Sequence, residues 1–71
     1  MPKHSEVASR FGDKLRKLRK KKEVSQEELA DRAGLHRTYV SSVERGERNV
    51  SLETIDKLAR ALNLSLRDIM P

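Results

Sequence analysis

Apolar residues in this chain recur three and four positions apart, which is the spacing of one face of an α-helix. In the first third of the chain Val7, Phe11, Leu15 and Leu18 follow one another at steps of four, four and three. Such a stripe predicts an amphipathic helix over about residues 5–22 whose apolar side faces the core. Gly12 lies inside this helix, where glycine costs about 1 kcal/mol relative to alanine.

Four later segments begin with the same local pattern, in which an apolar residue precedes a candidate N-cap and another follows four positions after it. This pattern is the hydrophobic staple of helix N-termini. Ser25 has Glu28 three residues on, as in a capping box, and Ser65 has Asp68 as a weaker version, whereas His36 is the poorest cap. We therefore predict helices at about 25–33, 36–45, 51–62 and 65–70.

The predicted helix ends leave only short connections. Gly34 and Gly46 each follow a predicted helix and are placed to adopt the left-handed conformation that ends one. Connections of two to five residues force consecutive helices to pack on each other. The chain is therefore expected to be all-α, a compact five-helix bundle that forms one domain over residues 1–71. The inward positions of its later helices are Leu29, Ala30, Val40, Val43, Ile55, Leu58, Ala59 and Leu62.

Composition narrows the class of protein. Only 35% of the 71 residues are hydrophobic and none is cysteine, which excludes disulfides, thiolate zinc sites and thiol redox chemistry. No apolar run exceeds two residues, so no membrane-spanning segment is expected. The start of the chain, residues 1–6, has no apolar stretch of the kind found in secretory signals. We expect a cytoplasmic protein.

Positive charge is concentrated in the predicted first helix. The chain carries +5 overall, but residues 5–22 hold eight basic and two acidic side chains, a local charge of +6. Such a block attracts polyanions, either nucleic acid or an acidic membrane surface. Two alternatives are a solvated helix face and a membrane-surface helix, although the lack of tryptophan speaks against the membrane.

Residues 25–45 have the form of a helix-turn-helix. Two helices of about eight residues are joined through a turn that contains Gly34, and the small Ala30 lies where the second helix would cross the first. The second helix would present short polar and cationic side chains to a DNA major groove. The expected outward residues are Arg37, Thr38, Ser41 and Ser42.

At these residues the chain resembles the phage-repressor and Cro type of helix-turn-helix regulators, over roughly residues 8–70. The motifs that carry the resemblance are Ser25-Gln26-Glu27-Glu28-Leu29-Ala30, Ala33-Gly34-Leu35, Val43-Glu44-Arg45-Gly46 and Leu58-Ala59-Arg60-Ala61-Leu62. Within that family it is most similar to the controller proteins of restriction–modification systems. This closer likeness lies in His36-Arg37-Thr38-Tyr39-Val40, Glu44-Arg45 and Arg48-Asn49.

The resemblance implies roles for individual side chains. Base-reading positions fall on Arg37, Thr38 and Ser42, although Arg37 as a phosphate contact and Ser42 as a solvated residue are the alternatives. Positions that contact the DNA backbone fall on Gln26, Tyr39, Arg48 and Asn49; the alternatives are an ordinary helix-start residue for Gln26 and plain packing surface for Tyr39. Apart from the resemblance, His36 at the start of its helix is expected to contact phosphate, and Arg19 could do so in addition to its structural role. The family also implies an ion pair between Arg19 and Glu44 that locks the first helix against the second helix of the motif.

A second copy of the chain is an expected partner, because family members act as two-fold dimers on near-palindromic sites. Apolar residues at the C-terminal end are expected to form the dimer surface, with closure of the monomer core as the alternative. These residues are Leu64, Leu66, Ile69 and Met70. RNA polymerase is a further candidate partner, and the acidic residues that could contact it are Glu27, Glu28 and Asp31.

The function expected from these residues is sequence-specific DNA-binding regulation of transcription, as repressor, activator or both. Autoregulation and control of a restriction–modification operon are implied by the resemblance alone. The alternative is an antitoxin-type interaction module that also binds its own promoter. We expect no enzyme, metal or cofactor, because His4 and His36 are the only histidines and no serine has a base at a suitable spacing.

Overall fold

The computed structural model describes residues 5–70, and within them it contains five α-helices and no strand. The helices are α1 (Glu6–Lys21), α2 (Gln26–Ala33), α3 (Arg37–Glu44), α4 (Leu52–Ala61) and α5 (Leu66–Ile69). Each lies inside the range predicted from the sequence, so the all-α five-helix fold is confirmed. Residues 1–4, on which the expected absence of a secretory signal partly rests, lie outside the described residues.

Serine side chains cap four of the five helices. The hydroxyl groups of Ser5, Ser25, Ser51 and Ser65 each accept a hydrogen bond from the backbone N–H three residues on. His36, before α3, makes no such side-chain bond. These caps satisfy backbone donors that a helix start otherwise leaves without a partner.

The relative strength of the two capping boxes is the reverse of the prediction. At α5 the box is complete, because Asp68 also accepts from the backbone of Ser65 at 3.0 Å. The hydrogen bonds that the Asp68 carboxylate accepts from the backbone N–H and the hydroxyl of Ser65 lower its pKa. At α2, by contrast, the carboxylate of Glu28 accepts from Arg32 at 3.1 Å. Arg32, one turn further along α2, therefore competes with the backbone N–H of Ser25 for the Glu28 carboxylate.

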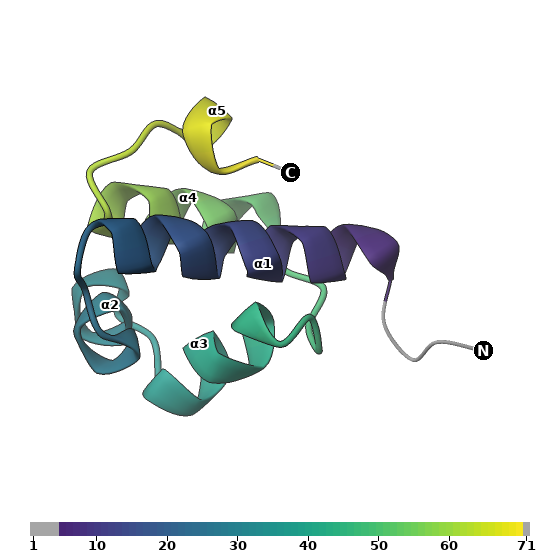
Figure 1. Cartoon of the computed structure of the whole chain (residues 1–71), viewed down its shortest axis with the longest axis horizontal. Coiled ribbons are helices and arrows are strands. Elements are labelled where there is room, and N and C mark those ends of the chain that lie inside the picture. The colour runs from purple at the N-terminus through teal and green to yellow at the C-terminus, as the bar shows by residue number, and fades with distance from the viewer. Residues whose placement is uncertain (1–4, 71) are drawn as a thin grey trace.

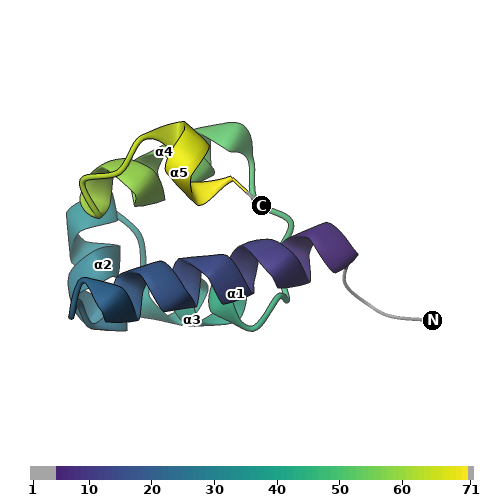
Figure 2. The ribbon, with the colours of Figure 1, turned by 45° about the horizontal axis from the view of Figure 1, so that its top comes forward.

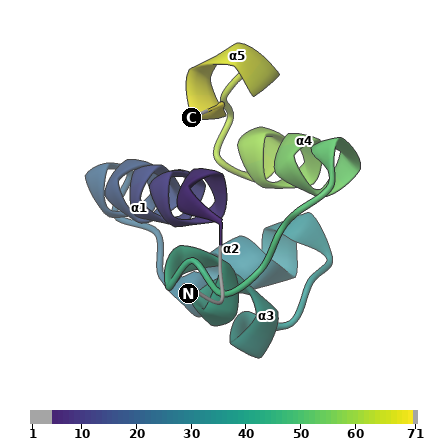
Figure 3. The same ribbon diagram turned by 90° about the vertical axis from the view of Figure 1, so that its right-hand side faces the viewer.

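The five helices pack around one core. Helix α2 packs on α3 and α4, α1 packs on α3, and α5 packs on both α4 and α1. Figures 1 and 2 show α3 on the opposite side of α1 from α5, and Figure 3 shows the short α5 lying over both α1 and α4. The Nζ of Lys14 donates to the carbonyl of Met70 at 2.6 Å, which ties the end of α5 to α1. Helix α3 packs on α1 and α2, and its residues Arg37 and Thr38 remain exposed.

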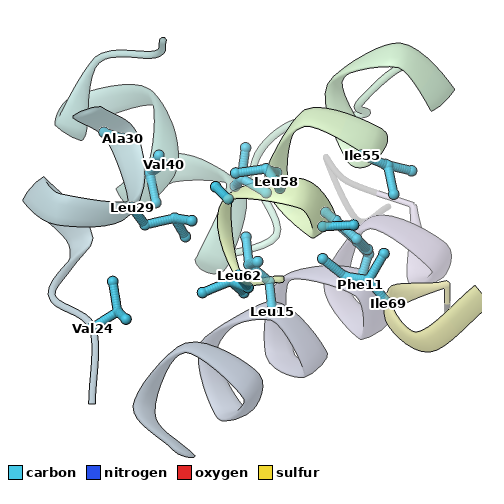
Figure 4. Packing of buried hydrophobic residues seen from close by; sticks show 13 residues of the cluster. Phe11, Leu15, Val24, Leu29, Ala30, Val40, Ile55, Leu58, Leu62 and Ile69 are labelled. Carbon is cyan, nitrogen blue, oxygen red and sulfur yellow. The ribbon is translucent and has the colours of Figure 1, made fainter. Parts of the chain in front are cut away.

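Side chains from all five helices meet in the core, as Figure 4 shows. Leu15, Leu29, Val40, Leu58 and Ile69 are fully buried. One inward prediction is wrong: Val7 is 52% exposed and the next residue, Ala8, is buried in its place.

At Gly12, α1 lies directly against the backbone at the end of α3. A Cβ atom at this position would lie 2.3 Å from the carbonyl oxygen of Val43 and 2.9 Å from that of Glu44. Both atoms belong to the backbone at the end of α3, so they cannot rotate away. The residue that weakens α1 as an isolated helix therefore allows α1 and α3 to pack together.

Candidate nucleic-acid interface

The first turn of α3 projects from the surface of the bundle. Gly34 adopts a left-handed φ of 70° after α2, and the N–H of Leu35 donates to the carbonyl of Ala30 at 2.8 Å. This tight turn brings His36, Arg37 and Thr38 into exposed positions at the start of α3. Val40, on the opposite side of the helix, is fully buried. One side of α3 therefore packs on the core, while the side that carries Arg37 and Thr38 is exposed.

Ser42 does not belong to the exposed side of α3, and this burial speaks against the base-reading role predicted for it. Its side chain is only 6% exposed. The hydroxyl donates to the carbonyl of Tyr39 at 2.7 Å and accepts from Nε of Arg48 at 3.2 Å. The hydroxyl is thus engaged by two groups of its own chain and lies away from the open side of α3.

Tyr39 and Arg48 lie against each other beside α3. The guanidinium carbon of Arg48 is 5.6 Å from the centre of the Tyr39 ring, within the range of a cation–π contact. Arg48 is exposed and Tyr39 is half-buried. The pair therefore presents an aromatic hydroxyl and a cation at one edge of the α3 surface.

Asn49, the neighbour of Arg48, is held by the first residue of the described chain. The hydroxyl of Ser5 donates to Oδ1 of Asn49 at 3.0 Å and accepts from the N–H of Ala8 at 2.9 Å. The amide nitrogen of Asn49 is thereby left as a donor for another group. The segment between α3 and α4 is thus linked to α1.

Arg19 and Glu44 form a buried ion pair between α1 and α3. Nε and Nη2 of Arg19 donate to the two carboxylate oxygens of Glu44 at 2.6 and 3.0 Å. Nη1 of Arg19 donates to the carbonyl of Val24 at 2.9 Å. Arg19 is only 8% exposed and each of its three nitrogens donates within the protein, so its structural role is the one that the structure displays, and its additional phosphate contact stays a prediction.

Gln26 begins α2 and extends this network toward the surface. Its Nε2 donates to Oε1 of Glu44 at 3.0 Å, and the residue is half-buried. A side-chain amide carries two N–H groups, so one donor remains beside the N-terminus of α2. The network therefore links the last turn of α1 and the start of α2 to the end of α3.

Charge is distributed unevenly around this surface. The exposed cations of α1 and the turn after it include Arg16, Lys20, Lys21 and Lys22. Farther along, Arg45 forms an ion pair with Glu47 at 2.9 Å, and this carboxylate raises the pKa of Arg45 above its usual value. Acidic side chains of α2, including Glu27 and Asp31, line a hollow that also contacts His36 and Arg37.

The residues predicted to form a dimer surface divide into two groups. Ile69 is fully buried in the core of its own chain, which favours the alternative, closure of the monomer core, for this residue. Leu64 and Leu66 are half-buried against that core, and Met70 is 36% exposed. The staple of α5 explains this result, because Ile69 is its inward residue.

A metal-binding cluster and a membrane-spanning helix are both absent from the described residues. Within residues 5–70 there is no group of three His, Cys, Asp or Glu side chains placed to hold a metal ion. In the same range, no helix has both the length and the apolar character needed to cross a bilayer.

Two features of the site were missed in the sequence. The close approach at Gly12 was missed, although a glycine among good helix formers is a signal of close packing. The hydrogen bonds of Ser42 were also missed. Their signal was the position of Ser42, which lies three residues after Tyr39 and next to the buried Val43, so it shares the flank rather than the front of α3.

Comparison with known proteins gives concordant results. A helix-turn-helix family model matches residues 15–69. The chain is 49% identical over 61 residues to the control protein C.BamHI of Bacillus amyloliquefaciens, covering 84% of this chain and 75% of that protein. It is 46% identical over 66 residues to the control protein C.MunI of a Mycoplasma species, covering 92% and 89%. Its fold matches the restriction–modification controller protein C.AhdI of Aeromonas hydrophila with a TM-score of 0.86 at 52% identity, covering 89% and 96%.

Proposed function

The chain belongs to the helix-turn-helix family of DNA-binding transcription regulators, most like restriction–modification controller proteins, and we propose that it binds a near-palindromic operator as a homodimer. Residues 1–71 act as one domain in this proposal, and α3 of each copy enters the major groove. The operator lies at the protein's own promoter within a restriction–modification operon in the cytoplasm. The assignment to a restriction–modification operon is supported by the likeness to the restriction–modification controller protein C.AhdI.

The observation that carries the proposal is the exposure of Arg37 and Thr38 on the first turn of a helix whose back is buried. In helix-turn-helix complexes the N-terminal residues of this helix contact base edges. A guanidinium can bridge O6 and N7 of guanine, and a threonine can offer its methyl group to thymine. We assign base reading to these two residues.

The residues around α3 supply contacts to the DNA backbone in this proposal. Gln26 retains one amide N–H beside the N-terminus of α2, where free backbone donors favour an anion. His36 and Tyr39 flank the base-reading residues, while Arg48 and Asn49 present donors from the segment after α3. These five contacts fix the register of α3 in the groove and carry no sequence information of their own.

Substitution of Arg37 and Arg48 separates the two kinds of contact. The operator is first selected from a random DNA library with the wild-type protein, and affinities for operator and unrelated duplexes are then measured by fluorescence anisotropy. Arg37→Ala should reduce discrimination between the two by about 1–3 kcal/mol. Arg48→Ala should weaken binding to both duplexes by the same factor. Equal losses on both duplexes for both variants would contradict the base-reading role of Arg37.

The dimer surface in this proposal is the outward side of α5. Leu66 and Met70 keep exposed apolar area there, and Leu64 lies in the turn before them. Packing of two copies on this side relates the two α3 helices by a two-fold axis, so that they reach half-sites about one DNA turn, roughly 34 Å, apart.

A charge on α5 should therefore separate the two copies. Leu66→Glu should convert the dimer to a monomer in analytical ultracentrifugation, because an ionised carboxylate cannot be buried without a partner. Val7→Glu is the control, since Val7 is an apolar residue that is 52% exposed at the far end of α1, away from α5. A dimer that survives Leu66→Glu but dissociates in Val7→Glu would place the interface elsewhere.

A further inference from the structure

We propose that Ser42 is a positioning residue for DNA-backbone binding, whose buried hydroxyl holds Arg48 in the conformation that grips a phosphate. The inference rests on the proposed function, because it concerns the same α3 surface. It gives a role to a hydroxyl that is engaged within its own chain.

The hydrogen bonds of Ser42 have a defined direction. A serine hydroxyl carries one hydrogen and two acceptor lone pairs. The carbonyl of Tyr39 can only accept, so the Ser42 hydrogen is directed to it at 2.7 Å. The lone pairs of the oxygen then face the Nε–H of Arg48 at 3.2 Å. One buried oxygen atom thus connects the backbone of α3 to a side chain that comes from outside the helix.

Arg48 is held at two points and free at a third. Its Nε is bonded to Ser42, and its guanidinium carbon lies 5.6 Å from the centre of the Tyr39 ring. Among residues 5–70, no hydrogen bond is formed by Nη1 or Nη2 of Arg48. These two groups are the pair with which a guanidinium grips a phosphate through two parallel hydrogen bonds.

Holding the arginine before DNA arrives strengthens binding. Ordering a long flexible side chain at an interface carries an entropic cost. The hydroxyl of Ser42 and the ring of Tyr39 already restrict Arg48 in the free protein, so less conformational entropy is lost when DNA binds. Loss of the hydroxyl would leave Arg48 able to contact phosphate but free to adopt other rotamers.

Ser41 provides a matched control on the same helix. Its hydroxyl accepts from Nη1 of Arg45 at 2.6 Å and has no contact with Arg48. Both serines lie in α3, so replacing either by alanine has a similar effect on helix propensity. Only the Ser42 substitution removes the partner of Arg48.

DNA affinity is measured for the full chain and four variants, Ser42→Ala, Ser41→Ala, Arg48→Ala and the double variant of Ser42 and Arg48. Ser42→Ala should weaken binding to operator and unrelated duplexes alike, by about fivefold. In the Arg48→Ala background the same change should have almost no further effect, and any loss in Ser41→Ala should be confined to the operator, because Ser41 contacts Arg45 and not Arg48. Loss on the operator alone in Ser42→Ala, or effects that multiply in the double variant, would overturn the proposal.

Nuclear magnetic resonance of the DNA-free protein gives a readout that a general structural role would not move. The Nε–Hε signal of Arg48 should shift and exchange faster with water in Ser42→Ala, and should stay in place in Ser41→Ala. An unchanged signal in Ser42→Ala would refute the positioning role. If the wild-type protein bound neither duplex, the proposed function would fail while this signal still reported on Ser42.

Discussion

Glu44→Ala is expected to remove about 3–5 kcal/mol of folding free energy, because it leaves the buried guanidinium of Arg19 without its carboxylate. Arg19 is 8% exposed, and two of its three nitrogens donate to Glu44. A domain of 71 residues has a total stability of only about 4–11 kcal/mol. Urea denaturation followed by circular dichroism should therefore show that the variant has lost a large part of its unfolding free energy at 25 °C.

The exposed pair of Asp56 and Arg60 is the control for this experiment. Their nitrogen and oxygen atoms lie 3.0 Å apart on the surface of α4, and Asp56→Ala should cost less than about 1 kcal/mol. Replacing both Arg19 and Glu44 by methionine should recover part of the loss, because no buried charge then remains. A Glu44→Ala protein as stable as Asp56→Ala would show that the pair does not hold α1 against α3.

Gly12→Ala is expected to destabilise the fold, although alanine is the better helix former by about 1 kcal/mol. The added methyl group would lie 2.3 Å from a backbone oxygen of α3, so α1 has to move away from that helix. Overpacking of this kind costs about 1–3 kcal/mol and sometimes more. The midpoint of thermal unfolding should fall accordingly, and the Arg19–Glu44 pair should loosen with the same movement.

Asp13→Ala tests whether this loss comes from packing. Asp13 follows Gly12 on α1, and its side chain is exposed, with Lys17 3.9 Å away as its ion-pair partner. The substitution should change stability by less than about 0.5 kcal/mol. If Gly12→Ala instead raised the unfolding midpoint, helix propensity would outweigh the contact between α1 and α3, and the packing argument would be wrong.

Much of the fold could be predicted from the sequence because helix starts are encoded locally. A serine cap accepts from an N–H only three residues away, so Ser25, Ser51 and Ser65 could be recognised without knowledge of the rest of the chain. The inward residues of α4 followed from spacing in the same way. The family resemblance then supplied the Arg19–Glu44 pair, which joins residues 25 positions apart.

What could not be predicted depends on the rotation of each helix about its own axis. Ser42 shares the polar character of Ser41 and Thr38, but a small rotation of α3 places it under Arg48 instead of in the open. Val7 and Ala8 differ from the prediction for the same reason at the start of α1. Ile69 satisfied both a core and a surface interpretation, and burial of an apolar side chain in its own chain requires no partner.

The most direct test of the base-reading role of α3 removes one acceptor from the DNA. Single guanines of the selected operator are replaced by 7-deazaguanine, which lacks the N7 atom that an arginine bridges together with O6. At one guanine in each half-site, the replacement should weaken wild-type binding by about tenfold and leave the affinity of Arg37→Ala unchanged. Equal weakening of both proteins, or no weakening of the wild type at any guanine, would contradict the insertion of Arg37 into the major groove.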